Sequence, residues 1–414
     1  MVPFPTSSGK RMSAALVLAA IVVSPFAVRG VFGQSKQQTS RGDALGTPMF
    51  TTDQSVTNFS ANADTIPYWR ASFTDPSNGV TYPITMVGTN PDTGDVSTSV
   101  PTVIIPFRFN FVSSADPAVH TLDGTDRVND TVFSPMFQDD SDIGAAADAT
   151  ASAPPDEPGV APAHARPVRE PHDVTQVGDA IYRAQWGKTG TGYHVLLGQP
   201  AVLPTISFDV PANQGFIVVG RSSGAHIGLM NASWFSSRLN ETLRNLQISS
   251  KTLAIFLVNN VFLYVQQPGN CCILGYHGAT SSLNGNGRQQ VNTYMFASFS
   301  DPGVFAPNPG DRFSYIADIH GLSHEVQEWL DDPFVNNIVN PWLTPTAPQY
   351  GCTSFLETGD PVVGFGFIIR TNNREYHPED EVHFSWFARE SPSRAAKGYY
   401  TYLNNFGGVA QGCR

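Results

Sequence analysis

A long stretch without aromatic residues is the feature that most restricts where this chain can build a core. No Phe, Trp or Tyr occurs between Phe137 and Tyr182, and residues 145–173 are mainly Ala, Pro, Asp and small polar residues. Such a segment cannot bury enough apolar surface to offset the entropy lost on ordering. We therefore expect a disordered Ala/Pro-rich insertion at 137–176, between a region at 34–136 and a domain at 177–414.

Residues 1–33 follow the pattern of a secretory signal peptide. Lys10 and Arg11 precede an apolar run over 12–28, which is interrupted by Pro25, and small residues follow it. The run is shorter than the roughly 20 residues that a membrane-spanning helix needs. We expect cleavage of this segment and a mature chain that is secreted, with no membrane as a partner.

The charge balance argues against nucleic acid as a partner. The chain has 24 Lys and Arg against 35 Asp and Glu, a formal net charge of -11, and we find no local basic cluster. Binding to phosphates needs the opposite sign of charge. Charged residues make up only 14 % of the chain, so we expect a surface of Ser, Thr, Asn, Gln and Gly.

The order of predicted strands and helices indicates an α+β fold. The region 34–136 is predicted to be β-rich, because short runs such as 68–73 and 103–109 are β-branched and aromatic. After the insertion, the spacing of apolar residues predicts helices near 180–186 and over 234–246. Two candidate strands follow, and their residues are 253–265 and 290–299.

Four cysteines suggest two disulfide bonds in a secreted chain. They are Cys271, Cys272, Cys352 and Cys413. Because a bridge between neighbouring cysteines has strained geometry, we expect the first two to pair with the last two, in either of the two possible ways.

Residues 315–333 combine a helical apolar stripe with three possible metal ligands. The polar face of this predicted helix carries His320, His324 and Glu328, and Pro333 ends the helix after Leu330. These side chains are four residues apart and span about 12 Å, so one ion has to use a neighbouring pair. The apolar stripe consists of Ile316, Ile319, Leu322, Val326, Trp329 and Leu330.

The residue that follows the first ligand favours one of the two pairs. A hydrolytic zinc helix has ligands at i and i+4 and a general-base carboxylate at i+1. The pair His324 and Glu328 has Glu325 at that position, whereas the pair His320 and His324 has Gly321. We therefore predict a His-Glu-x-x-Glu site with Glu325 as the base, and His320 as a neighbour or alternative ligand.

Three segments together resemble a family of secreted zincin-like metallopeptidases. That family has a Ser-His-Glu-x-x-Glu helix, an Asp-Asp-Pro turn and a downstream Glu-x-Gly-Asp segment, which match 323–328, 331–333 and 357–360. The resemblance implies a zincin-like core, a mixed sheet with an active-site helix, and a third metal ligand at Glu357 or Asp360. One His and two carboxylates make a harder site than is usual for Zn²⁺, so another divalent metal is an alternative.

The mechanism that this resemblance implies is metal-assisted hydrolysis of a peptide or protein substrate. The ion lowers the pKa of a water and polarises the scissile carbonyl, while Glu325 takes the water's proton and passes it to the leaving amine. A donor to the developing oxyanion is also needed. Candidates for this donor are His277, Tyr376, His377 and His383.

Four other interpretations of the same residues stay open at this point. His324, Glu325 and Glu328 can form an ordinary solvated helix face, or the chain can be a non-catalytic secreted binding protein on a zincin-like scaffold. A glycoside hydrolase would use two carboxylates, for example Glu325 with Glu357. Oxygen ligands for Ca²⁺ are also available, from Asp331, Asp332, Asn336 and Asn337.

Overall fold

The computed structural model describes residues 45–140, 143, 174–220, 223–306, 311, 313–346, 351–395 and 398–413. The predicted signal peptide at 1–33 and most of the predicted insertion at 137–176 lie outside this part of the chain. Asp140 and Thr175 form a β-bridge, so the two ends of that segment lie side by side.

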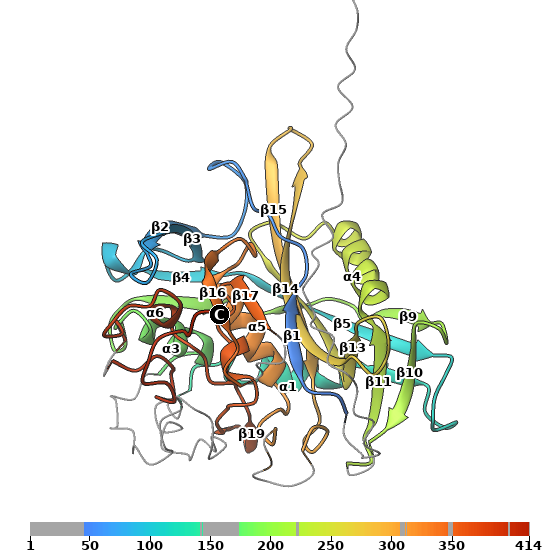
Figure 1. Cartoon of the computed structure of the whole chain (residues 1–414). Helices are drawn as coiled ribbons and strands as arrows, with labels where there is room; N and C mark the ends of the chain where they lie inside the picture. Colours follow the sequence, from blue (N-terminus) through green and yellow to red (C-terminus); the bar gives the residue numbers. More distant parts are fainter. Residues whose placement is uncertain are drawn as a thin grey trace, which may run out of the picture.

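A large mixed sheet forms the body of the molecule (Figure 1). Its main path runs through β10 (Gly215–Val219), β11 (His226–Asn231), β13 (Val261–Tyr264), β14 (Cys271–Leu283), β15 (Gln289–Phe299), β12 (Leu253–Asn259), β5 (Thr102–Phe111) and β6 (Thr121–Asp123). Off this path, β1 (Met49–Thr52) pairs with β14, and β8 (Ala201–Val202) and β9 (Ile206–Val210) pair with β5. Strands from the predicted β-rich region thus belong to the same sheet as later strands.

Four two-stranded sheets and a few helices surround this sheet. The small sheets pair β2 (Tyr68–Thr74) with β3 (Thr81–Val87), β4 (Ser97–Val100) with β7 (His194–Leu197), β16 (Ile338–Leu343) with β17 (Cys352–Phe355), and β18 (Ile369–Thr371) with β19 (Arg374–Tyr376). The helices are α1 (Val128–Val132), α3 (Val177–Ala184), α4 (Ala232–Leu246), α5 (His320–Asp331) and α6 (Phe384–Phe387). This mixture confirms the predicted α+β class.

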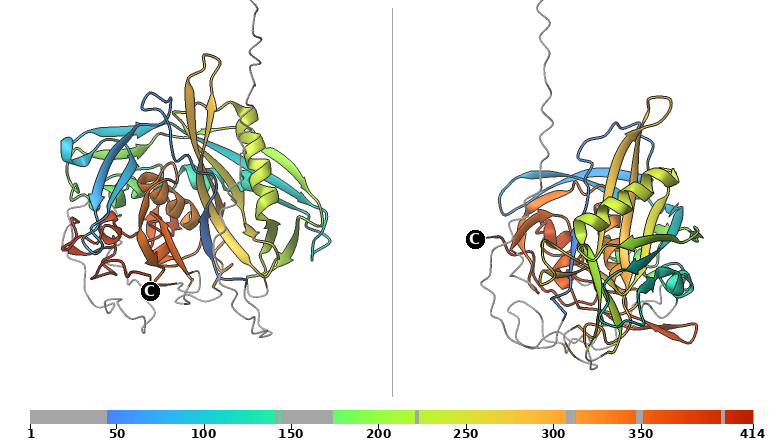
Figure 2. Two further views of the ribbon diagram at one scale, coloured as in Figure 1. Left: turned by 45° about the horizontal axis from the view of Figure 1, so that its top comes forward. Right: turned by 90° about the vertical axis from the view of Figure 1, so that its right-hand side faces the viewer.

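Helices α4 and α5 cover opposite faces of the sheet (Figure 2). Successive side chains of a strand point to opposite faces. In β12, Ile255 belongs to the apolar cluster of Leu322 and Val326 from α5, whereas Phe256 belongs to that of Phe235 and Leu239 from α4. Both faces of β12 are therefore buried.

Helix α5 differs from its prediction in its start and its surroundings. It begins at His320 rather than near Tyr315, because Asp318 adopts a positive φ of 42° and its carboxylate accepts a hydrogen bond from the backbone N–H of Ile319. Every residue of α5 is buried, the polar ones included. This burial excludes a solvated helix face for His324, Glu325 and Glu328.

The other predicted elements are present with shifted ends. The helix near 180–186 is α3, and the helix over 234–246 is α4. The strand predicted over 253–265 is divided into β12 and β13, because Asn260 takes a left-handed conformation with φ 49°.

The predicted disulfide pairing is wrong. Cys271 is bridged to its neighbour Cys272, and Cys352 to Cys413. The expectation rested on the strained geometry of a bridge between neighbouring cysteines. The peptide between Cys271 and Cys272 is cis, with a Cα–Cα distance of 3.0 Å.

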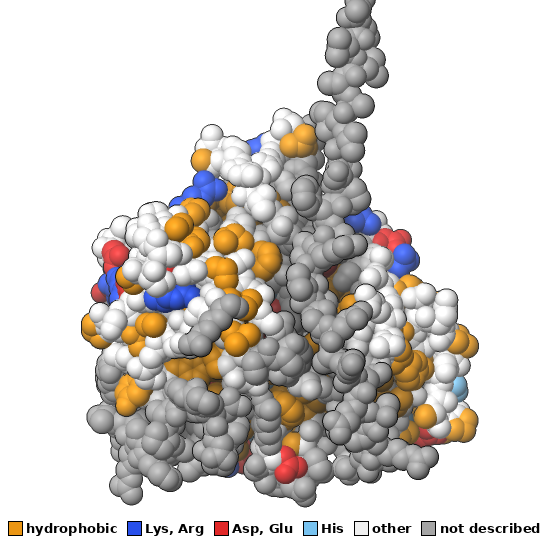
Figure 3. Space-filling model, viewed as in Figure 1, with side chains coloured by type: hydrophobic (Ala, Val, Ile, Leu, Met, Phe, Trp, Pro, Cys, Tyr) orange, Lys and Arg blue, Asp and Glu red, His pale blue; other side chains and the backbone are white. Residues whose placement is uncertain are grey.

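The surface agrees with the low content of charged residues. On the face drawn in Figure 3, blue and red side chains are scattered among uncharged ones. None of the helices in the described ranges has the length and apolar composition needed to cross a membrane.

Candidate metal centre

Two glycines let the chain approach the functional residues of α5 closely. A methyl group at Gly275 of β14 would lie 2.6 Å from Glu325 Oε1, and one at Gly359 would lie 2.3 Å from His324 Nδ1. Contacts this short leave no room for a side chain at either position. Strand β14 and the loop before Asp360 therefore enclose His324 and Glu325 from two sides.

His324 is oriented by a carboxylate and points its other nitrogen at two more. Its Nδ1 lies 2.5 Å from Glu379 Oε2. Its Nε2 lies 3.0 Å from Glu328 Oε1 and 4.0 Å from Asp360 Oδ1, but has no hydrogen-bond partner among the described residues. A carboxylate on one imidazole nitrogen with the other nitrogen free is the usual arrangement of a metal-binding histidine.

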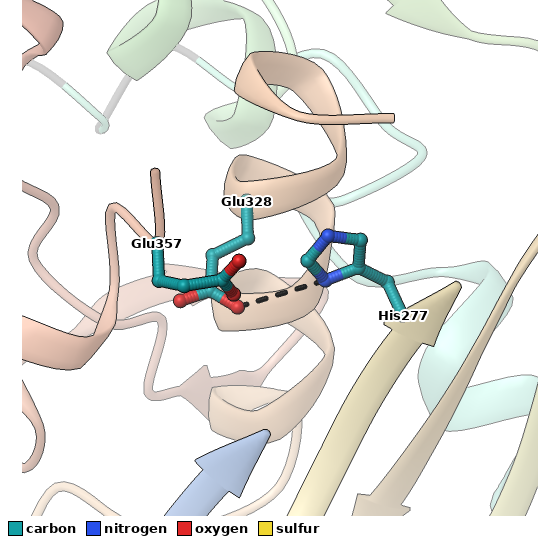
Figure 4. A group of neighbouring side chains, drawn as sticks. All are labelled: His277, Glu328 and Glu357. Atoms are coloured by element: carbon teal, nitrogen blue, oxygen red, sulfur yellow. Dashed lines mark ion pairs between the residues drawn. The ribbon is translucent and has the colours of Figure 1, made fainter. Parts of the chain in front are cut away.

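Glu328 lies at the middle of the cluster. Its Oε1 accepts a hydrogen bond from the backbone N–H of Gly359, at 3.3 Å. Its Oε2 lies 3.7 Å from Nδ1 of His277, the ion pair drawn in Figure 4. Glu328 therefore presents one oxygen toward His324 and the other toward His277.

Glu325, the predicted base, lies beside His277 of β14. Its Oε2 is 3.2 Å from His277 Nδ1, and its Oε1 has no hydrogen-bond partner in the described structure. Suitable atoms of His324, Glu325 and Glu328 all lie within 4.8 Å of one another. The predicted base thus lies next to the predicted ligand pair.

Both predicted third ligands lie at the cluster, on different sides of Glu328. Asp360 begins a short 3₁₀ turn, Asp360–Val362, and approaches His324. Glu357 instead forms a group with Glu328 and His277, with one atom of each within 4.8 Å of the others (Figure 4). The two candidates for the third ligand thus lie at different positions: Asp360 beside His324, and Glu357 beside His277.

His320 lies outside this ligand set. Its Nε2 is 3.3 Å from Glu379 Oε1, so it shares the carboxylate that orients His324. Two hydrogen bonds hold Glu379 in turn. Its backbone N–H donates to Ser323 Oγ, and its Oε1 accepts from the backbone N–H of Gly364.

Sequence reasoning missed Glu379 and the neighbouring Glu381, which forms a further possible ligand group with His324 and Glu379. The signal that could have found them is an acidic run, 379–381, in a segment otherwise rich in aromatic residues.

The carboxyl groups of the cluster repel one another, and all but that of Asp360 are buried. Burial, and then the charge of Glu328, raise the pKa of Glu325 and of Glu357 well above its usual value. The same two causes raise the pKa of Asp360 to about 8. Without a bound cation, the protonated forms of these three carboxyl groups are therefore favoured.

His324 supplies the positive charge that the protein itself provides. Burial lowers the pKa of His324, but the charges of Glu328 and Glu379 outweigh this and raise it well above 6.5. In turn, the pKa values of Glu328 and Glu379 are lowered, because the neighbouring histidines outweigh the effect of burial. In the metal-free protein, a protonated His324 ring is thus favoured between ionised Glu328 and Glu379.

The residues present fit a divalent metal ion. Four buried ligand atoms lack a hydrogen-bond partner within the described ranges, which is costly for polar groups away from water. These atoms are His324 Nε2, Glu325 Oε1, Glu328 Oε2 and Glu357 Oε1.

Of the candidate oxyanion donors, the structure brings His277 to the cluster. His377 instead pairs with Asp318, with Nδ1 and Oδ2 2.6 Å apart, and no contact places His383 or Tyr376 beside Glu325.

The two carboxylates considered as Ca²⁺ ligands accept hydrogen bonds from protein groups. Asp332 accepts hydrogen bonds from the backbone N–H groups of Asn336 and Asn337, and Asp331 accepts one from the Gln185 side chain.

No protein-family model, curated protein or solved structure matches this chain. Function has to be inferred from the residues themselves.

Proposed function

We propose that this chain is a secreted metal-dependent hydrolase, and that its substrate is a peptide or protein. His324, Glu328 and Asp360 would hold a divalent ion, with Glu325 as general base. The observation that carries the proposal is the buried group of His324, Glu325 and Glu328, whose ligand atoms lie within 4.8 Å of one another, with His324 Nδ1 held by Glu379. The export pattern at 1–33 supports secretion.

The order of the elements supports a zincin-like core. Strands β12 to β15 precede α5 in the chain, and α5 packs against β14 and β15. The helix then presents its His-Glu-x-x-Glu residues toward the middle of β14, where His277 lies. A mixed sheet with an active-site helix is the arrangement that the sequence resemblance implies.

Each residue of the cluster has a distinct task in this proposal. A bound ion supplies Lewis acidity, which lowers the pKa of a water and polarises the scissile carbonyl. Glu325 accepts the water's proton and returns it to the leaving amine. Glu379 holds the His324 ring in place.

The ligand set restricts which divalent ions suit the site. One imidazole and two carboxylates form a site that suits Zn²⁺ and the harder Mn²⁺. We propose Zn²⁺ as the native ion and Mn²⁺ as the alternative.

The burial of the cluster favours a second candidate, a non-catalytic protein that the metal stabilises. His324, Glu325 and Glu328 are 0 % exposed, and Phe50 of β1 stacks on His324 with ring centroids 3.5 Å apart. The side chain of Asp360 is 27 % exposed, so solvent reaches the cluster at this ligand. A hydrolase has to admit its substrate on this side.

Glu325→Gln separates the two candidates. The purified protein is assayed on a mixture of fluorogenic peptides, with and without a chelator, and its metal content is measured. We expect hydrolysis that the chelator abolishes and added metal restores, and a loss of about 100-fold or more in Glu325→Gln with its metal retained. Glu241→Gln, an exposed glutamate of α4, is the control with unchanged activity. Wild-type protein that holds metal but hydrolyses none of the peptides supports the non-catalytic candidate.

A further inference from the structure

The hydrogen bonds of His277 determine which of its nitrogens is free to bind a ligand. His277 is fully buried, and its Nε2 lies 3.2 Å from the backbone carbonyl oxygen of Asp332. A carbonyl oxygen only accepts, so Nε2 carries the proton. In the neutral ring, this leaves a lone pair on Nδ1.

This lone pair faces two more acceptors. Nδ1 lies 3.2 Å from Glu325 Oε2 and 3.7 Å from Glu328 Oε2. Three acceptor atoms that approach one another in a dry interior repel unless a proton or a cation lies between them. Glu357 Oε1 and Glu328 Oε2 are buried there and have no hydrogen-bond partner in the described part of the chain.

The surroundings of His277 repeat those of His324. Each ring has an acceptor on its outer nitrogen, Asp332 O in one case and Glu379 Oε2 in the other. Each directs its inner nitrogen at one oxygen of Glu328. Figure 4 shows this for His277. This is the outer hydrogen bond that orients metal-binding histidines in proteins.

We propose that His277 Nδ1, Glu328 Oε2 and Glu357 bind a second divalent cation, so that Glu328 bridges two ions. One carboxylate bridging two ions about 3.5–4 Å apart is the common geometry of two-metal hydrolytic sites. The proposal rests on the proposed function for the first ion, at His324 and Asp360.

Charge supports two ions rather than one. When ionised, the buried Glu325, Glu328 and Glu357 and the partly exposed Asp360 bring four negative charges together, and a single divalent ion leaves half of that charge unbalanced. Two divalent ions balance it. The alternative occupant of the His277 side is a proton shared between Glu328 and Glu357.

Metal stoichiometry tests this proposal. The purified protein is loaded with Mn²⁺, freed of excess ion by gel filtration, and analysed by mass spectrometry for metal and by electron paramagnetic resonance. We expect about two ions per chain with an exchange-coupled spectrum in the wild type. In both His277→Ala and Glu357→Gln we expect about one ion per chain with the spectrum of isolated Mn²⁺.

A conservative substitution and a control variant keep the result interpretable. Glu357→Gln keeps the size and hydrogen-bonding capacity of the side chain, so it tests the site even if His277→Ala fails to fold. His226→Ala is the matched control, because His226 also pairs with a carboxylate, Asp116, at 2.9 Å but lies outside the cluster. It should keep the wild-type stoichiometry.

The outcomes distinguish this proposal from the proposed function. About one ion per chain in the wild type, unchanged in His277→Ala and Glu357→Gln, overturns the second site and leaves the first intact. A wild-type protein that retains no metal overturns both.

Discussion

Gly359→Ala tests whether the position of His324 determines metal binding. Gly359 has a φ of -82°, which any residue adopts, so the substitution causes no backbone strain. The new methyl group would lie 2.3 Å from Nδ1 and 2.4 Å from Cε1 of His324. To reach ordinary van der Waals contact, the ring has to move by about 1 Å. Phe50 stacks on the same ring at 3.5 Å, which restricts where it can go.

The expected effect on metal binding is larger than the effect on folding. Metal–ligand distances tolerate changes of about 0.2 Å, so a shift of about 1 Å should lower the metal affinity about 100-fold. Overpacking should lower the unfolding free energy of the metal-free protein by about 1–3 kcal/mol.

Competition with a chromogenic chelator measures the affinity, and urea unfolding measures the stability. Gly407→Ala is the control, because nothing lies within 4 Å of its added methyl group. Wild-type metal affinity in a folded Gly359→Ala protein would refute the assignment of His324 as a ligand.

Three further perturbations probe the surroundings of the site. Burial raises the pKa of Asp331 to about 8, above its value of 3.8 in an unfolded chain; the folded state therefore holds an extra proton between these values. The unfolding free energy should fall as pH rises from about 4 to 8, and less steeply in Asp331→Asn; equal slopes in urea titrations would contradict this. Phe50→Ala should lower the unfolding free energy by about 3–5 kcal/mol and speed the removal of metal by a chelator. An unchanged removal rate would show that the Phe50 ring does not limit the chelator's access to the metal. Replacing both Cys352 and Cys413 by Ser should lower the unfolding free energy by about 4 kcal/mol, because their bridge closes a loop with a sequence separation of 61; a loss below about 1 kcal/mol would contradict the loop-entropy estimate.

The local part of the site could be predicted from the sequence. The i, i+4 spacing of His324 and Glu328 places both side chains on one helix face whatever the rest of the fold does. Glu325 follows from the same helical geometry. The acidic segment with Glu357 and Asp360 came from the family resemblance, and the structure brings both residues to the cluster.

The partners from distant segments could not be predicted. Glu379 contacts His324 across 55 residues of sequence, and His277 contacts Glu325 across 48. Such contacts depend on how β14 and the 379–381 segment pack around α5, and no local spacing encodes that packing. For the same reason His277 was one of four equal candidates for the oxyanion donor.

The errors in the fold have local conformational causes. The apolar stripe continues upstream of His320, so its periodicity predicted a helix that begins too early. The positive φ of Asp318 prevents the helix from extending upstream of His320. The disulfide pairing failed because the general rarity of bridges between neighbouring cysteines does not hold for Cys271 and Cys272. Side-chain patterns do not report such local geometry.

The metal content of three purified proteins tests the central claim most directly. The claim is that a divalent ion binds to the pair His324 and Glu328, with His320 outside the ligand set. Metal analysis of the wild type should find bound metal, which is lost in Glu328→Ala and retained in His320→Ala. Retention of metal in Glu328→Ala together with its loss in His320→Ala would contradict the account.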